Sequence, residues 1–67
     1  MLDIVVNGTP QRIARASSIA DLVRSLDLDP ARVAVERNRV IVPRSTLAEA
    51  ALADGDRIEI VEFVGGG

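Results

Sequence analysis

The chain has 67 residues and a formal net charge of −2, enough for one small domain but too little for a deep active site. It has no cysteine and no histidine, which removes disulfides, thiolate chemistry and the commonest metal ligand and acid–base side chain. The basic residues are arginines spread along the chain, and Phe63 is the single aromatic residue, so nucleic acid is a poor candidate partner.

The start of the chain has no basic region followed by an apolar segment, so no signal peptide is expected. No apolar run approaches the roughly 18 residues of a membrane span. A cytoplasmic protein without a membrane partner is therefore predicted.

A β-hairpin is predicted first. Apolar residues alternate as in a half-buried strand, at Leu2, Ile4 and Val6. Asn7-Gly8 is a strong signal for a type I′ turn, in which both central residues have positive φ. A second strand is expected from about residue 9 to 14, with Ile13 facing inward.

One amphipathic helix follows. Ser18 and Asp21 have the spacing of a capping box. Apolar residues then recur on one helical stripe, at Ile19, Leu22, Val23 and Leu26. Pro30 cannot continue the helix, so it is expected to end near Leu26 and residues 27–32 to form a loop.

The middle of the chain predicts two strands and a helical turn. Alternation resumes at Val33 and Val35, and residues 40–42 form a short apolar edge strand that ends at Pro43. Thr46 opens a second possible capping box with Glu49, which predicts a short helical turn through residue 52.

Charged pairs in this region have structural interpretations. Asp54 and Asp56 could suggest a cation site, but they flank a glycine, and turn chemistry explains them better. Arg37 and Arg39 are expected in a solvated turn, with contact to an acidic partner surface as the alternative.

The last strand offers two different faces. Ile58 and Ile60 share one face and are expected in the core. Val61 and Phe63 share the other, where two alternatives stay open. A loop or second small cluster covers them, or they form an apolar patch that binds a partner, with Phe63 as the anchor.

The strand passes directly into Gly65-Gly66-Gly67. Glycines have no side chain to pack and lose the most backbone freedom on ordering, so a fold gains nothing from them. They can form a slender arm roughly 10 Å long that enters a narrow channel. The alternative is a frayed end or linker. We therefore divide the chain into a domain, residues 1–64, and a flexible tail, residues 65–67.

The order of elements predicts an α+β protein of the β-grasp type. We expect a mixed sheet of four to five strands, one main helix and a short helical turn. Right-handed crossover from the hairpin allows the last strand to lie centrally, parallel to the first.

The whole chain resembles the ThiS-type sulfur carriers of thiamin biosynthesis, which are ubiquitin-like proteins. The most specific likeness is the run from residue 52 to 61 leading into the glycines. Residues 6–8, 33–35 and 42–44 support it. Asn38-Arg39 stands where such carriers usually have Asn-Gly, and Thr46 stands where an aromatic is common.

The resemblance implies that Gly67 is the modified residue. A ubiquitin-activating-enzyme-like adenylyltransferase would use ATP to adenylate its carboxylate, and a sulfur donor protein would convert the adenylate to a thiocarboxylate that serves thiazole synthase. Gly65 and Gly66 would let the backbone enter the partner's cleft. In the partner-binding alternative drawn above from the strand faces, Val61 and Phe63 would contact partners beside the tail, with Val64 entering the cleft.

The resemblance also implies a protein cosubstrate with no catalytic residue, no metal and no bound cofactor of its own. Two alternatives remain. One is a carrier like the small subunit of molybdopterin synthase, which shares the fold and the Gly-Gly end. The other is a non-catalytic β-grasp binding module, for which the glycines should not matter.

Overall fold

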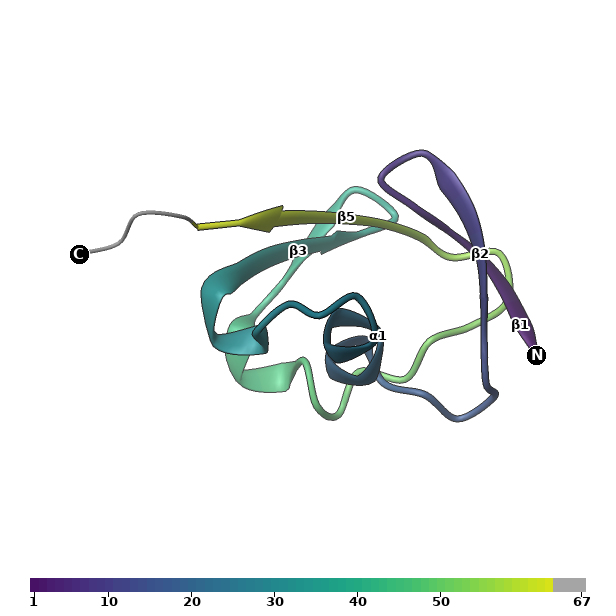
Figure 1. Cartoon of the computed structure of the whole chain (residues 1–67), viewed down its shortest axis with the longest axis horizontal. Helices are drawn as coiled ribbons and strands as arrows, with labels where there is room; N and C mark the ends of the chain where they lie inside the picture. Colours follow the sequence, from purple (N-terminus) through teal and green to yellow (C-terminus); the bar gives the residue numbers. More distant parts are fainter. Residues whose placement is uncertain (64–67) are drawn as a thin grey trace.

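The computed structural model describes residues 1–63, and they form one five-stranded sheet with a helix on one face (Figure 1). In chain order the elements are β1 (Leu2–Val6), β2 (Thr9–Ile13), α1 (Ile19–Ser25), the 3₁₀ turn η1 (Pro30–Arg32), β3 (Val33–Arg37), β4 (Val40–Val42), the 3₁₀ turn η2 (Arg44–Thr46) and β5 (Arg57–Glu62).

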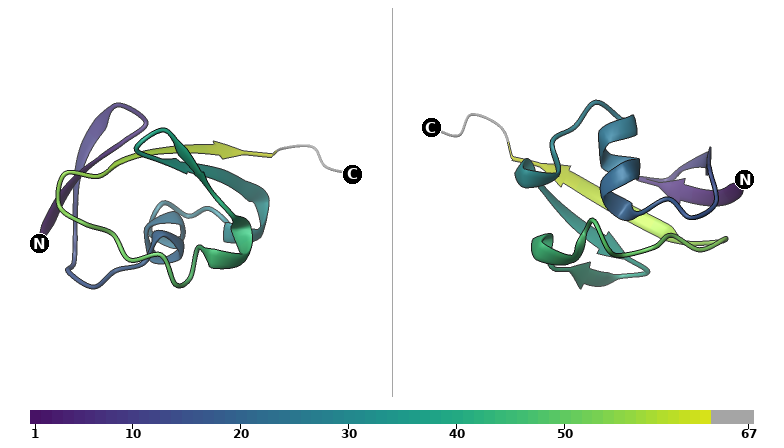
Figure 2. Two further views of the ribbon diagram at one scale, coloured as in Figure 1. Left: turned by 180° about the vertical axis from the view of Figure 1, so that it is seen from behind. Right: turned by 90° about the horizontal axis from the view of Figure 1, so that it is seen from below.

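The sheet places the last strand in its middle. Its strand order is β2-β1-β5-β3-β4. β5 pairs in parallel with β1 and antiparallel with β3, while β1–β2 and β3–β4 are antiparallel hairpins. The view from below shows α1 against one face of the sheet (Figure 2). The predicted β-grasp arrangement is confirmed, including the central, parallel position of the last strand.

Local signals explain the first half of the fold. Asn7 and Gly8 have φ of 49° and 81°, the positive values that a type I′ turn requires. In the capping box, the Ser18 hydroxyl accepts from the Asp21 amide at 3.0 Å, and the Asp21 carboxylate accepts from the Ser18 amide at 2.9 Å. Helix α1 is capped at Leu26, as predicted.

The core lies between α1 and the sheet. It consists of the inward-facing side chains of β1, β3 and β5, the apolar stripe of α1, and two residues of the segment before β5. Its members are Leu2, Ile4, Val6, Ile19, Ala20, Leu22, Val23, Val33, Val35, Leu47, Leu52, Ile58 and Ile60. Ile13 and Leu26, both predicted to face inward, are only half-buried because they lie at the edge of this cluster.

Two predictions between the strands were wrong. Residues 27–32 are not all loop, because Asp29 caps η1 by accepting from the Ala31 amide at 2.9 Å. The second capping box does not form. Thr46 is the last residue of the helical turn η2, and its hydroxyl donates backward to the carbonyl of Pro43 at 2.9 Å. The backbone still turns after Thr46, because its carbonyl accepts from the Glu49 and Ala50 amides at 3.0 and 2.9 Å.

Among residues 1–63, no helix has the length and apolar character needed to cross a membrane.

Candidate functional site

The candidate site is the end of β5 and the sheet face around it. The predictions for Val64, Gly65, Gly66 and Gly67 lie outside the residues that the structure describes. What the structure does show is how the strand leading to them is held and which surface surrounds it.

The Asn7 side chain continues the hydrogen bonding between β1 and β5 beyond the end of β1. The parallel ladder pairs β1 only with Arg57 and Ile58. Beyond it, Asn7 Oδ1 accepts from the Ile60 amide at 2.8 Å, and Asn7 Nδ2 donates to the Ile60 carbonyl at 3.2 Å. The side chain of Asn7 thus bonds both the amide and the carbonyl of Ile60 in β5, although Asn7 itself lies beyond the end of β1. The sequence analysis identified Asn7 only as a turn residue.

Phe63 is held at the point where β5 ends. Its amide donates to the carbonyl of Arg32 in η1 at 2.8 Å. The guanidinium of Arg44 in η2 lies 5.9 Å from the centre of the Phe63 ring, within the range of a cation–π contact. The ring is still 53% exposed. The two 3₁₀ turns therefore fix the direction of the strand without burying its aromatic side chain.

The outer face of the sheet, opposite α1, carries exposed apolar side chains. Val61 is 61% exposed, so within residues 1–63 no loop or second cluster covers Val61 or Phe63. Ile41 of β4 is 73% exposed. The sequence analysis placed Ile41 in an edge strand but did not assign it to this face, because only the pairing register gives the face of a strand that is apolar throughout.

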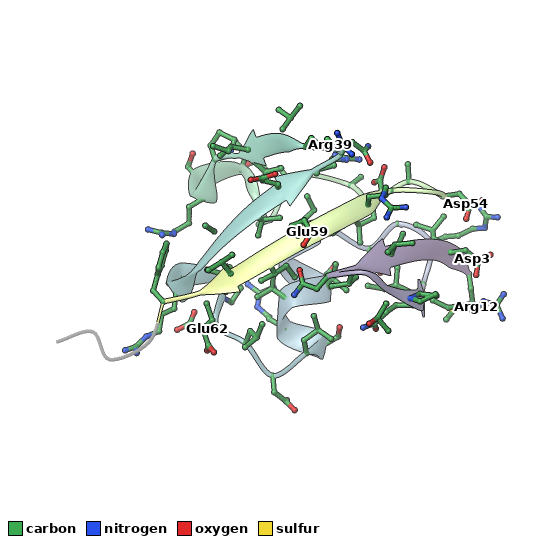
Figure 3. All side chains as sticks on the ribbon, turned by 90° about the horizontal axis from the view of Figure 1, so that it is seen from above. Asp3, Arg12, Arg39, Asp54, Glu59 and Glu62 are labelled. Atoms are coloured by element: carbon green, nitrogen blue, oxygen red, sulfur yellow. The ribbon has the colours of Figure 1, made fainter. Side chains whose placement is uncertain are left out.

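Two acidic side chains lie among these apolar ones. Glu36 of β3 and Glu59 of β5 are directly opposite in the antiparallel register. Glu59 lies near the middle of β5 when the outer face is viewed from above (Figure 3). A hollow of about 140 Å³ on this face is lined by Ala34, Val35, Glu36, Ile41, Glu59 and Val61. We call it the acidic hollow.

A buried carboxylate organises the entry to β5. Asp56 is 6% exposed and accepts from the Arg37 guanidinium at 3.1 Å, from the Asn38 amide group at 3.2 Å and from the Ala53 amide at 2.9 Å. The prediction of a solvated turn was therefore wrong for Arg37, whose side chain is 29% exposed and paired. Asp54 has a structural role of its own, because its carboxylate accepts from the amide of Asp3 in β1 at 2.7 Å and so ties the loop before β5 to the first strand.

The turn between β3 and β4 has an unusual residue. Asn38 and Arg39 have φ of 50° and 70°. These are the positive values of a type I′ turn, so the chain keeps the Asn-Gly geometry with an arginine in the glycine position. Asn38 also accepts from the Arg57 amide at 2.9 Å, which ties this turn to the start of β5.

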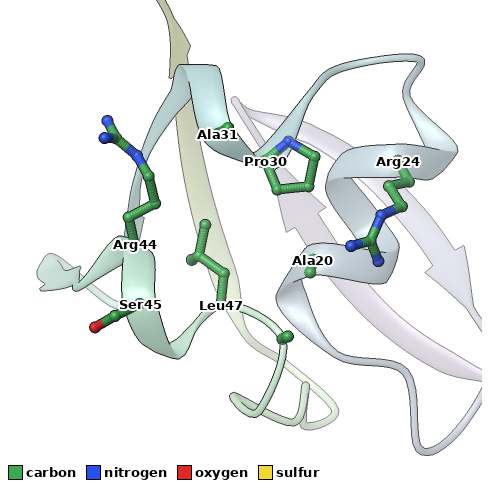
Figure 4. Close-up of a pocket in the computed structure, with 8 residues that line it drawn as sticks. Ala20, Arg24, Pro30, Ala31, Arg44, Ser45 and Leu47 are labelled. Carbon is green, nitrogen blue, oxygen red and sulfur yellow. The ribbon is translucent and has the colours of Figure 1, made fainter.

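A second hollow lies on the helix side of the molecule, between α1, η1 and η2 (Figure 4). Its volume is about 240 Å³ and its lining is mostly apolar. Arg24 and Arg44 contribute to it from different elements. Arg24 is paired with Asp21 at 3.8 Å, and Arg44 lies over Phe63.

Residues 1–63 contain no group of three or more acidic side chains placed to bind a metal ion. The pKa of the Asp21 carboxyl is lowered, mainly by the hydrogen bond from the Ser18 backbone. The cause is helix capping, so this shift has no bearing on a reaction.

Comparison with known proteins gives consistent results. Residues 4–67 match the sequence model of the ThiS family. The chain is 30% identical over 66 residues to the sulfur carrier protein ThiS of Escherichia coli, covering 98% of this chain and all of that protein. It is 48% identical over 50 residues to the sulfur carrier protein ThiS of Bacillus subtilis, covering 75% of this chain and 76% of that one.

Two further comparisons concern a longer protein and a solved structure. The chain is 42% identical over 66 residues to a thiazole synthase of Paramagnetospirillum magneticum, but it spans only 20% of that protein's length. The crystal structure of a thiamine biosynthesis protein (ThiS) from Geobacter metallireducens superposes with a TM-score of 0.81 at 29% identity, covering 98% of this chain and 100% of the other.

Proposed function

This chain belongs to the ThiS family, and we propose that it carries sulfur for thiazole formation in thiamin biosynthesis as a thiocarboxylate on Gly67. The family match carries this proposal, because it runs through the glycines to residue 67 and so includes the segment on which the chemistry depends. Two relatives named sulfur carrier protein ThiS support it.

The proposed chemistry has two steps at one carboxylate. An oxygen of the Gly67 carboxylate attacks the α-phosphate of ATP and displaces pyrophosphate, giving an acyl adenylate. A sulfur nucleophile then attacks the acyl carbon and displaces AMP. With hydrosulfide as donor, the products are the thiocarboxylate, AMP and one proton, so no oxidant or reductant is needed.

The partners supply everything except the carboxylate. The sequence has no cysteine or histidine, so neither a sulfur carrier thiol nor an imidazole base comes from this chain. We assign ATP binding and activation to a ubiquitin-activating-enzyme-like adenylyltransferase and delivery of sulfur to a donor protein. We assign sulfur acceptance to a thiazole synthase, in keeping with the relative of that name.

The arrangement of β5 supports this division of labour. The strand is central, and Asn7 and Arg32 hold its last residues by hydrogen bonds. A strand held this way has a fixed direction at its end. Val61 and Phe63, exposed beside the strand end, provide apolar area for a partner, and we include Val64 in the same contact.

Intact mass measures the proposed modification directly. The purified protein is incubated with ATP, its cognate adenylyltransferase and sulfide. Exchange of one oxygen for sulfur, located on Gly67 by fragmentation, is the expected result, and the same spectrum shows whether Gly67 is the last residue of the natural chain. Absence of both adenylate and thiocarboxylate with an active partner would refute the carrier function and favour the binding module.

One substitution in the glycine segment tests whether the partner's cleft admits only a chain without side chains. Gly66→Val adds a side chain that should clash in the partner's cleft without changing the folded domain. We expect an unchanged melting temperature and no adenylation. Normal adenylation of the folded variant would contradict the need for a slender arm.

Phe63→Ala tests the docking role of the strand end. The ring is more exposed than buried, so its loss should cost the fold about 1 kcal/mol or less, while the affinity for the adenylyltransferase falls. Calorimetric titration and thermal unfolding measure the two effects. A large drop in melting temperature with unchanged affinity would make Phe63 a structural residue.

A further inference from the structure

The acidic hollow contains a charge arrangement from which the folded chain gains nothing. Glu36 and Glu59 are Cα partners across β3 and β5. Side chains directly opposite in such a pair are about 4.5–5.5 Å apart at Cβ, and like charges there are destabilising. Among residues 1–63 the ion pairs engage other carboxylates, those of Asp3, Asp21, Asp29 and Asp56. Neither glutamate forms an ion pair within the described part of the chain.

Apolar side chains surround the two carboxylates. Ile41 of β4 lies opposite Glu36 of β3. Val61 of β5 lies opposite Ala34 of β3, two residues along the strands from the glutamate pair. All of them line the same hollow on the outer face. A partner that covers this apolar surface would also remove water from both carboxylates, and an acid pair without a counter-charge would oppose that burial.

The two hollows differ in the charged side chains that line them. The hollow between α1, η1 and η2 is bordered by Arg24 and Arg44, whereas the acidic hollow on the outer sheet face is bordered by Glu36 and Glu59. A basic group on a partner therefore favours the acidic hollow over the other one.

We infer that the acidic hollow receives one basic side chain of the thiazole synthase, an arginine that bonds both Glu36 and Glu59 while Ile41 and Val61 pack against apolar residues around it. An arginine suits this position because its planar guanidinium carries five donors in a fixed fork that matches carboxylate oxygens. One cation between two carboxylates also removes their mutual repulsion. The identity of the occupant rests on the function proposed above; the acidic and apolar chemistry rests on the sheet alone.

The test compares four forms of the full chain by calorimetric titration against purified thiazole synthase, at low and moderate salt. They are the wild type, the double variant Glu36→Gln/Glu59→Gln, and the single variants Glu59→Gln and Glu49→Gln. Glu49 is exposed on the loop after η2 and lies outside the hollow, so its variant makes the same charge change elsewhere.

The double variant should bind about tenfold or more weakly, with a smaller salt dependence, and Glu59→Gln should be intermediate. The melting temperature of the double variant should equal or exceed that of the wild type, because a like-charge pair has been removed. Glu49→Gln should match the wild type in affinity. This pattern, in which binding weakens while stability does not, is not produced by a purely structural role.

Four results would overturn the inference. The first three are unchanged affinity of the double variant, an equal loss in Glu49→Gln, and no binding of the wild type to the synthase. The fourth comes from a parallel titration against the adenylyltransferase: a loss seen only with that enzyme would assign the hollow to it. Thiocarboxylate formation by the wild type is measured separately, so that failure of this inference can be told apart from failure of the carrier function.

Discussion

The contact of Asn7 with Ile60 makes the sharpest prediction about how β5 is held. Replacing Asn7 by glycine keeps the positive φ of 49° accessible but removes both hydrogen bonds to Ile60. At about 0.5–1.5 kcal/mol per bond, the free energy of unfolding should fall by about 1–3 kcal/mol. For a domain of this size, that corresponds to a drop in melting temperature on the order of 5–20 °C.

A second variant separates the hydrogen bonds from backbone strain. Asn7→Ala removes the same bonds and also places a Cβ in the left-handed region. It should therefore be less stable than Asn7→Gly by about 1 kcal/mol. Urea unfolding followed by circular dichroism measures both differences.

Hydrogen exchange locates the effect in the structure. The Ile60 amide should lose protection in Asn7→Gly, because its acceptor is the deleted Oδ1 atom. The Phe63 amide, which donates to Arg32 directly after the end of β5, serves as the control. If Asn7→Gly unfolds within about 0.5 kcal/mol of the wild type and Ile60 exchange is unchanged, the side chain does not hold β5.

Three further variants test the turns and the cap. Arg39→Gly should stabilise the protein by about 0.5–1 kcal/mol, since glycine adopts φ of 70° without strain; a lower urea midpoint would show that the arginine side chain contributes more than its backbone costs. Asp56→Ala should cost about 3 kcal/mol, because it removes the buried carboxylate that accepts from the Arg37 guanidinium and the Ala53 amide; an unchanged melting curve would contradict this. The pKa of Asp21 is lowered in the folded state by the hydrogen bonds from Ser18, so its contribution to stability is present above its ordinary pKa and is lost as the pH falls through the lowered value. Asp21→Asn should therefore show a smaller loss of stability on acidification than the wild type, and identical acid profiles would exclude a role for the cap.

The elements could be predicted because their signals are local. The hairpin at Asn7-Gly8, the capping box of Ser18 and the stop before Pro30 each depend on residues within a few positions of one another. The inward faces of β1, β3 and β5 follow from period-two alternation. Thr46 shows the limit of such reasoning, because its hydroxyl bonds backward to Pro43 although the spacing fits a cap.

The candidate site could be predicted only in part. The alternation of the last strand indicated an apolar second face at Val61 and Phe63, but their exposure depended on whether another segment covered the outer face, which no local pattern reports. The acidic hollow was missed because Glu36 and Glu59 are separated in sequence and meet only through the register of β3 with β5. Arg37 was misjudged for the same reason, since its partner Asp56 lies 19 positions away.

The sequence by itself determined the order and type of most elements, the β-grasp arrangement and the absence of cysteine and histidine chemistry. Backbone propensity, caps and turns act over a few residues, and side-chain types do not change on folding. Only the tertiary structure decided which side chains meet: Asn7 with Ile60, Arg37 with Asp56, and Glu36 with Glu59. Each of these pairs depends on strand register, and register is set by the packing of the whole core and not by either residue of the pair.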